Sequence, residues 1–156
     1  VAAGSSAGAE TVMWSGYVNA SDRWAGIVSF SGAVDATALP DSSDPPLLAI
    51  HGQCDELVPA GRDVHHFCSL DSPGAWKLIG GPAWADALRS VGVPATTWIQ
   101  CEGDHMVCNS ALDNSSIIDL IIAWIESRCQ NEQDVVVDHE GRPVQPGHSS
   151  CPQPCN

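Results

Sequence analysis

Val1-Ala2-Ala3-Gly4-Ser5-Ser6-Ala7-Gly8 opens the chain. The five residues from Gly4 to Gly8 have the pattern G-x-S-x-G, preceded by a short apolar run and followed by a helix-like run. At a sharp turn from a strand into a helix, this pattern holds a serine in strained backbone geometry with its hydroxyl exposed. We expect that only glycine fits at both flanks. The pattern therefore predicts that Ser6 is a nucleophile and that the Ala7 N–H, at the helix start, is one oxyanion-hole donor. A serine that merely begins a helix would match the same five residues, so the interpretation depends on the sequence downstream.

The composition favours one acidic domain. With 156 residues, 44% of them hydrophobic, the chain can bury a single core. Its formal net charge of −13 and its pI near 4.4 argue against binding to nucleic acid or to an anionic membrane surface, since both would repel it. The longest apolar run, from Ile117 to Ile125, is interrupted by Asp119 and is too short to span a bilayer. We predict no membrane span.

Seven cysteines in so short a chain indicate an oxidising compartment, and so a secreted protein. N-glycosylation sequons at Asn19 and Asn114 agree with secretion. The odd number of cysteines leaves one thiol to pair with another chain or with a segment outside this sequence. Because the chain begins at Val1 without Met or a signal peptide, we expect it to be processed or incomplete.

The order of predicted elements indicates an α/β fold with a mostly parallel sheet and flanking helices. After a strand that ends at the opening turn, we predict a helix over 7–20, strands over 26–32 and 47–50, helices over 60–68 and 81–91, a strand over 95–101 and a helix over 115–128. Strands that alternate with helices pair in parallel, and active sites lie at their C-terminal ends. From residue 130 the chain turns polar, with Pro, Gly and Gln, which predicts a tail over 130–156 held by Cys151 and Cys155.

Candidate catalytic residues follow three of the predicted strands. Ser6 follows the first strand, Asp55 the third and His105 the fourth. A serine hydroxyl needs an imidazole to accept its proton, and the imidazole needs a carboxylate to fix its tautomer and stabilise its cation. The chain supplies one of each, at the edge of the sheet where they could meet.

Three segments resemble α/β-hydrolase-fold carboxylesterases: 4–9, which reads GSSAGA, 45–59, which reads PPLLAIHGQCDELVP, and 102–105, which reads EGDH. The resemblance covers residues 1 to about 129 and corresponds to the C-terminal half of the family's domain. It implies a partial α/β-hydrolase fold and a secreted serine esterase that works through an acyl-enzyme on a small ester. It also implies that Ser6 is the nucleophile, His105 the general base and Asp55 the triad acid.

Members of that family carry further strands and a second oxyanion N–H ahead of the nucleophile. No segment here corresponds to them. We therefore expect another chain, or a missing N-terminal segment, to complete the sheet, because a central strand needs partners on both sides. The alternative is an extracellular structural or interaction module that keeps a hydrolase-like half-domain and uses its open edge to assemble with other chains.

Simpler interpretations exist for the acid and the base. Asp55 could be a loop aspartate in an Asx turn, and His105 a solvated loop histidine. Asp104 and Glu102 are alternative acids, although Asp104 adjoins His105 and would have difficulty facing its ring. A disulfide between Cys101 and Cys108 would clamp the histidine loop and is a further hypothesis.

The remaining histidines favour structural roles. We expect His51 to close the end of a strand. His65 and His66, on the predicted helix over 60–68, fit a solvated pair better than a metal site, since adjacent helix positions diverge and no third ligand is suitably spaced. We predict no metal and no cofactor.

Overall fold

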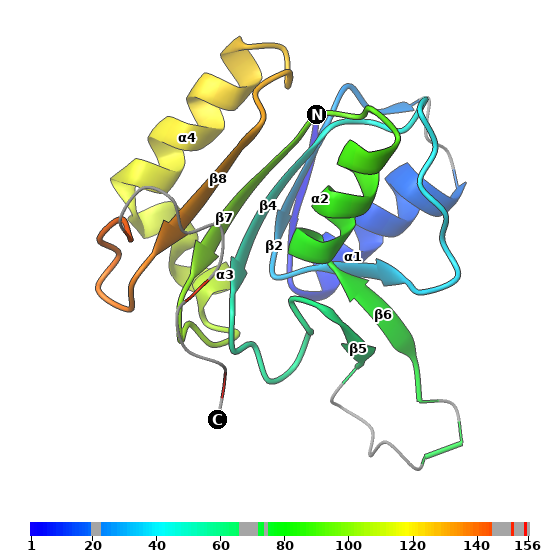
Figure 1. The fold of residues 1–156 in the computed structure, drawn as a ribbon, viewed down its shortest axis with the longest axis horizontal. Coiled ribbons are helices and arrows are strands. Elements are labelled where there is room, and N and C mark those ends of the chain that lie inside the picture. Colours follow the sequence, from blue (N-terminus) through cyan, green and yellow to red (C-terminus); the bar gives the residue numbers. More distant parts are fainter. Residues whose placement is uncertain (20–22, 66–71, 74, 145–150, 152–154, 156) are drawn as a thin grey trace.

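The fold is built on a parallel β-sheet, shown in Figure 1. The computed structural model describes residues 1–19, 23–65, 72–73, 75–144, 151 and 155. Within that part of the chain the main sheet has five strands, β1 (Ala2–Ser5), β2 (Ile27–Phe30), β4 (Leu47–Gly52), β7 (Ala95–Gln100) and β8 (Gln133–Val137), in the spatial order β1-β2-β4-β7-β8. Every neighbouring pair is parallel. The predicted α/β class with a mostly parallel sheet is confirmed.

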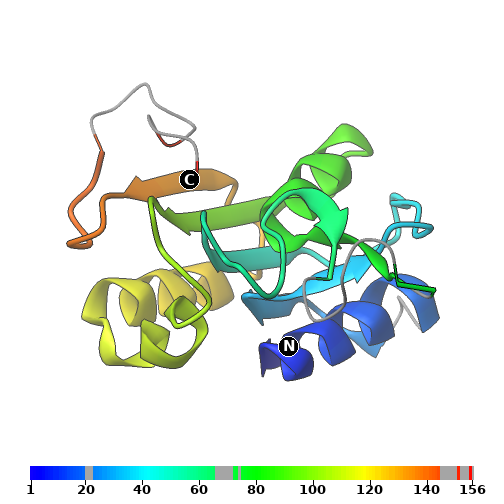
Figure 2. The same ribbon diagram turned by 90° about the horizontal axis from the view of Figure 1, so that it is seen from below.

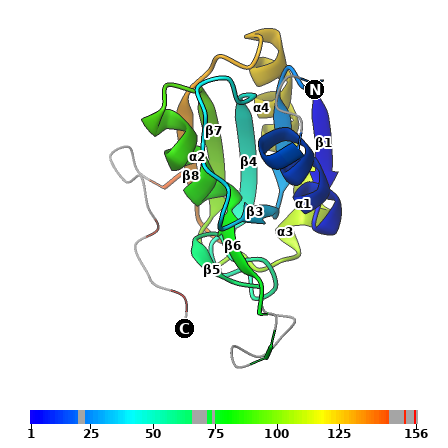
Figure 3. The ribbon, with the colours of Figure 1, turned by 90° about the vertical axis from the view of Figure 1, so that its right-hand side faces the viewer.

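Helices cover both faces of this sheet. They are α1 (Ala7–Trp14), α2 (Gly81–Ser90), α3 (Val107–Ser110) and α4 (Ser115–Glu126), with a π-helical turn at Ser15–Asn19 and a 3₁₀ turn at Ala111–Asp113. Figure 3 shows α1 and α2 in front of the sheet with α4 behind it, and Figure 2 shows α2 and α4 on opposite sides. The predictions over 81–91 and 115–128 are confirmed. The helix predicted over 7–20 is confirmed up to Trp14, where the π-helical turn replaces it.

Strand β4 shows why the sheet is buried on both faces. Leu47 and Ala49 pack into a core cluster with α1 and α2, whereas Leu48 and Ile50 pack into a second cluster with α3 and α4. Alternate side chains of a strand point to opposite faces, so a continuous apolar run supplies both layers. The run ends at the point where the chain leaves the sheet for the loop that carries Asp55.

A small antiparallel sheet lies beside the main one, with β3 (Ala33–Asp35), β6 (Lys77–Gly80) and β5 (Arg62–Val64) in the order β3-β6-β5. The helix predicted over 60–68 is therefore wrong at Arg62–Val64, which is a strand; residues 66–68 lie outside the described part. Pairing with β6 overrides the weak helical preference of this segment. The sequence analysis did not identify β6, whose short apolar run leads directly into α2.

The predicted tail contains the last strand of the main sheet. Gln133–Val137 forms β8, which pairs in parallel with β7, and Val136 and Val137 are buried. The sheet thus continues past residue 129, and the tail prediction is wrong for this segment. A single short apolar run in a polar stretch carries too little periodicity to predict a strand.

Two disulfide bonds are present among the described residues. Cys155 is bonded to Cys54, and Cys151 to Cys101, so both predicted anchors of the C-terminal segment are confirmed. The hypothesis of a Cys101–Cys108 bond is wrong, because Cys101 is bonded to Cys151 and Cys108, on α3, is a buried free thiol. The bonds indicate an oxidising environment.

Strand β1 lies at one edge of the main sheet and pairs with β2 alone among the described strands. Val1 and Ala3 are exposed along it. Across the described residues, no helix has the length and apolar character needed to cross a membrane.

Candidate active site

Ser6 lies in the sharp turn between β1 and α1, with φ 53° and ψ −125°. A positive φ is strained for a residue with a side chain, and such strain is typical of a nucleophile turn. Glycine is required at Gly4, because a Cβ there would overlap the carbonyl oxygen of Gly8. The expectation of the same need at Gly8 is wrong, since a Cβ there would meet open space. The close approach of the strand to the helix therefore constrains only one flank.

The structure brings Ser6, His105 and Asp55 into one hydrogen-bonded chain. Ser6 Oγ lies 2.8 Å from His105 Nε2, and His105 Nδ1 lies 2.7 Å from Asp55 Oδ2. The residues follow β1, β7 and β4 respectively, so the C-terminal ends of parallel strands gather them. His105 and Asp55 are buried, at 9% and 5% exposure. A carboxylate at Nδ1 favours the tautomer whose Nε2 can accept the Ser6 proton.

Asp55 holds its place through both carboxylate oxygens. Oδ1 accepts hydrogen bonds from the backbone N–H groups of Leu57 and Val58, each 2.9 Å, while Oδ2 faces His105. Burial acts to raise the pKa of Asp55, but hydrogen bonds from His51, Val58, His105 and Leu57 outweigh it and lower the pKa to about 2. The carboxylate is thus ionised, and the Asx-type turn considered as an alternative orients it toward the imidazole.

His51 contacts the Asp55 carboxylate. It is fully buried on β4, its Nε2–H donates to the Val58 carbonyl oxygen (3.1 Å), and the same nitrogen lies 3.4 Å from Asp55 Oδ2. The predicted role at the end of the strand did not include this contact with the acid. The spacing of four residues between His51 and Asp55 is the signal that could have indicated it.

The alternative acids stand apart from the imidazole. Asp104 is exposed, and its Oδ1 accepts from the Met106 N–H (2.9 Å). Glu102 is exposed with φ 59°, and its N–H donates to the side chain of Gln53. The carboxylate that His105 contacts is that of Asp55.

The Ala7 N–H lies at the start of α1, directly after Ser6. The first N–H groups of a helix have no partner within the helix, and Ala7 is exposed at the first position of α1. The N–H of Glu10 is bonded to the Ser6 carbonyl oxygen (3.0 Å), so the helical ladder begins one turn later. The role of Ala7 remains a prediction.

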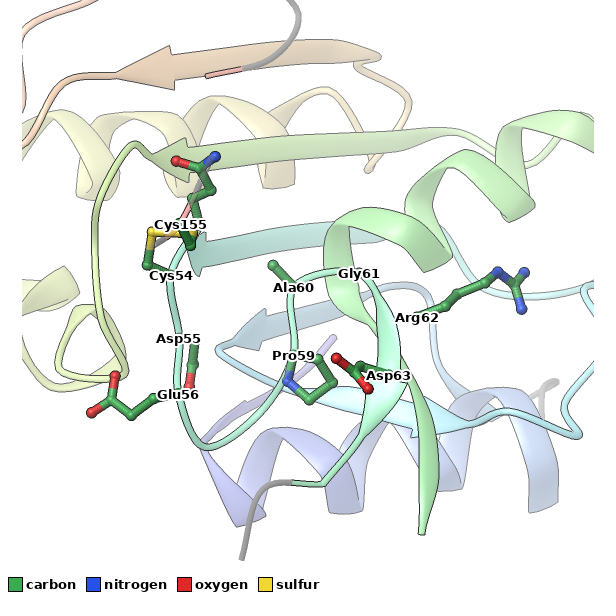
Figure 4. A pocket seen from close by; sticks show the side chains of 10 residues that line it. Cys54, Asp55, Glu56, Pro59, Ala60, Gly61, Arg62, Asp63 and Cys155 are labelled. Carbon is green, nitrogen blue, oxygen red and sulfur yellow. A yellow bond between two sulfur atoms is a disulfide. The ribbon is translucent and has the colours of Figure 1, made fainter. Parts of the chain in front are cut away.

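Both loops that carry the acid and the base are tethered. Cys54 precedes Asp55 and Cys101 directly follows β7, and both are bonded to the C-terminal segment. The loops also meet each other, since the Cys54 N–H donates to the Gly103 carbonyl oxygen (2.8 Å). A cavity of about 380 Å³ lies beside Asp55 and is lined by the loop that carries Asp55, the Cys54–Cys155 bond and the start of β5. Figure 4 shows the side chains that line it.

The predicted glycosylation sites and the His65-His66 pair are not part of this hydrogen-bonded chain. Asn114 caps α4, with Oδ1 accepting from the Ser116 N–H (3.0 Å). Asn19 is exposed, and the rest of its sequon lies outside the described residues. His65 follows strand β5 instead of lying on a helix, and His66 is outside the described part. Where the structure describes the chain, no three His, Cys, Asp or Glu side chains gather as metal ligands would.

Glu10, a second carboxylate, was not among the predicted site residues. It interacts electrostatically with both His105 and Asp55, and its Oε1 lies 3.6 Å from His65 Nε2. Its position one helical turn after Ser6 is the signal that could have identified it.

Comparisons with known proteins give no independent assignment. Neither the family models, nor the curated proteins, nor the solved structures include a match to this chain. An account of the function therefore depends on the geometry of the site.

Proposed function

We propose that the protein is a secreted serine hydrolase of the carboxylesterase type, related to the α/β-hydrolase-fold esterases that its segments resemble. The observation that carries the proposal is the chain of hydrogen bonds from Ser6 through His105 to Asp55. Two further observations support it: Ser6 has a positive φ at the turn, and four hydrogen-bond donors keep the Asp55 carboxylate ionised. The disulfide bonds next to the site support an extracellular location.

The reaction proceeds through an acyl-enzyme. Ser6 Oγ attacks the ester carbonyl while His105 Nε2 takes its proton, and Asp55 stabilises the imidazolium through Nδ1–H. The Ala7 N–H and the positive end of α1 stabilise the oxyanion. His105 then gives the proton to the leaving alcohol. In the second half, His105 activates a water that releases the acid and regenerates Ser6.

Covalent labelling tests this proposal. A fluorophosphonate should label Ser6 of the wild type, and Ser6→Ala should abolish the label. His105→Gln should slow labelling by a factor of roughly 10³ or more, because the proton acceptor is lost. Ser90→Ala, which removes an exposed hydroxyl at the end of α2, is the matched control and should label as the wild type does. A folded wild-type protein that is not labelled would exclude the enzyme.

The open edge of β1 supports a second proposal, that a further strand from another chain or segment pairs there. Exposed backbone N–H and C=O groups at a sheet edge are a template for strand addition. This is also the feature on which assembly as a non-enzymatic extracellular module would depend. Sedimentation at several concentrations tests it: self-association that Ala3→Pro abolishes would support strand pairing, and a monomer at every concentration would leave no role for a second copy.

A further inference from the structure

Glu10 brings an additional carboxylate to the proposed nucleophile. It lies one helical turn after Ser6 on α1, and its N–H donates to the Ser6 carbonyl oxygen (3.0 Å). Residues one turn apart lie above one another on a helix, so both side chains occupy the same end of α1. The charges of His105 and Asp55 both act on Glu10, so it lies within electrostatic range of the base and the acid.

One carboxylate oxygen of Glu10 is buried without a hydrogen-bond donor among the described residues. Its side chain is 14% exposed, yet Oε1 is buried and accepts no hydrogen bond from the described residues. His65 Nε2 lies 3.6 Å away, which is longer than a hydrogen bond. Burial raises the pKa of Glu10; the charge of His105 lowers it, and that of Asp55 raises it further. A buried carboxylate that lacks donors gains free energy when one approaches either of its oxygens.

The β5–β6 hairpin forms the wall beside Glu10. His65 and Trp76 continue the hairpin, with the His65 N–H donating to the Trp76 carbonyl oxygen (2.8 Å). Their rings are parallel within 7°, with centroids 6.5 Å apart, and Trp76 is 44% exposed. The Trp76 indole N–H donates to Asp35 Oδ2 (2.6 Å), which fixes the ring. The hairpin thus offers an aromatic surface near a carboxylate oxygen that accepts no hydrogen bond from the described residues.

We propose that Glu10 is a specificity-determining residue that accepts a hydrogen bond from a hydroxyl or ammonium group on the alcohol part of the ester, with Trp76 and His65 forming the wall of that subsite. The inference rests on the proposed esterase function. It assigns the alcohol part because His105 Nε2, which lies 2.8 Å from Ser6 Oγ, must protonate the leaving oxygen, and Glu10 lies one helical turn after Ser6. The net charge of −13 further favours a cationic donor.

Two matched pairs of acetate esters test the subsite. The hydroxyl pair is 2-hydroxyethyl acetate and propyl acetate; the ammonium pair is 2-(dimethylammonio)ethyl acetate and 3-methylbutyl acetate. Within a pair the shape is nearly constant, so the ratio of the kcat/KM values reports the donor. We expect the wild type to prefer the donor ester by roughly tenfold in at least one pair, as a hydrogen bond to a charged acceptor provides. The pair that shows the preference identifies the donor.

Substitutions of Glu10 assign that preference to its carboxylate. At about 500 mM salt, which screens the overall charge, Glu10→Leu should reduce both ratios to about one. Glu10→Gln should then lose the ammonium preference and keep part of any hydroxyl preference, since the amide oxygen still accepts. Each ratio is internal to one variant, so a change in the active fraction does not alter it. Glu126→Gln, an exposed carboxylate on α4 across the sheet, is the matched control and should keep the wild-type ratios.

The outcomes separate this inference from the function on which it rests. Ester hydrolysis that requires Ser6 but shows no donor preference, or a preference that survives in Glu10→Leu, overturns the subsite and leaves the esterase standing. A wild type that neither hydrolyses these esters nor reacts with a fluorophosphonate overturns both.

Discussion

At the scale of single residues, the carboxylate of Asp55 is held by contacts to both of its oxygens. Two backbone N–H groups and two imidazoles surround its carboxylate, and the side chain is 0% exposed. Ionisation of a group in such a place is linked to folding, because the unfolded chain offers none of these donors. The acid of the proposed triad is therefore also a source of stability.

The linkage predicts a pH-dependent stability. The folded pKa of Asp55 is lowered to about 2, so its contribution is present above the ordinary aspartate pKa and is lost as the pH falls through the folded value. With an ordinary pKa near 3.9, the contribution at neutral pH is about 2–3 kcal/mol. Urea unfolding of the wild type and of Asp55→Asn from pH 7 down to about pH 2 should show a stability difference that shrinks below about pH 4. A difference that stays constant with pH would contradict this.

His51 gives a second prediction at this scale. His51→Leu removes the donor to the Val58 carbonyl oxygen and the contact with Asp55, so the acid should lose its fixed direction toward His105. We expect kcat to fall by roughly tenfold with little change in KM, because the substrate does not touch His51. His51→Gln retains a donor and should recover part of the loss. Equal losses in both variants would mean that the packing of the ring matters and its hydrogen bond does not.

At the scale of elements, the turn from β1 into α1 determines where Ser6, the proposed nucleophile, lies. Gly4 and Gly8 flank the same serine in the sequence, yet they meet different surroundings: the strand presses Gly4 against the helix, and Gly8 faces open space. The geometry of this turn thus depends on one close backbone approach and on the positive φ of Ser6.

The two glycines make a matched pair of substitutions. Gly4→Ala should destabilise the protein by about 2 kcal/mol or more, because a backbone shift is needed to relieve the overlap. Gly8→Ala should be neutral or stabilising by up to about 1 kcal/mol, since alanine is the better helix former. Thermal unfolding of both variants measures the difference. Equal effects would show that the turn tolerates a side chain at Gly4.

At the scale of the whole molecule, acidic residues outnumber basic ones and give the protein a large negative net charge. The formal net charge is −13, with only 6 Lys and Arg residues in the chain. Such a field lowers the rate at which anionic molecules reach any site, and salt screens it. The charge thus acts on encounter rates without altering the fold.

This field predicts a salt-dependent selection among substrates. An ester with a carboxylate on its acyl chain should have a lower kcat/KM than its neutral isostere at about 10 mM salt, and the gap should narrow at about 500 mM, where the Debye length is a few Å. Measuring both esters at both salt concentrations checks the prediction. A gap that does not depend on salt would indicate a local contact instead of the overall charge.

The sequence alone determined the class of fold and the order of the candidate triad. Apolar runs such as Leu47 to Ile50 are long enough to be buried as strands, and the G-x-S-x-G pattern marks the turn at Ser6. These signals are local, because periodicity and turn chemistry act over a few residues. The same locality explains why residues 60–68 were predicted as a helix and why β6 and β8 were missed.

Only the tertiary structure decided which side chains meet. Strand pairing placed β8 beside β7 and β5 beside β6, and it directed Cys101 to Cys151 instead of to the nearby Cys108. It also brought His51 to Asp55 and Glu10 to His65. Such contacts join residues far apart in the chain, and their free energy comes from burial and hydrogen bonds that exist only once the sheet has formed.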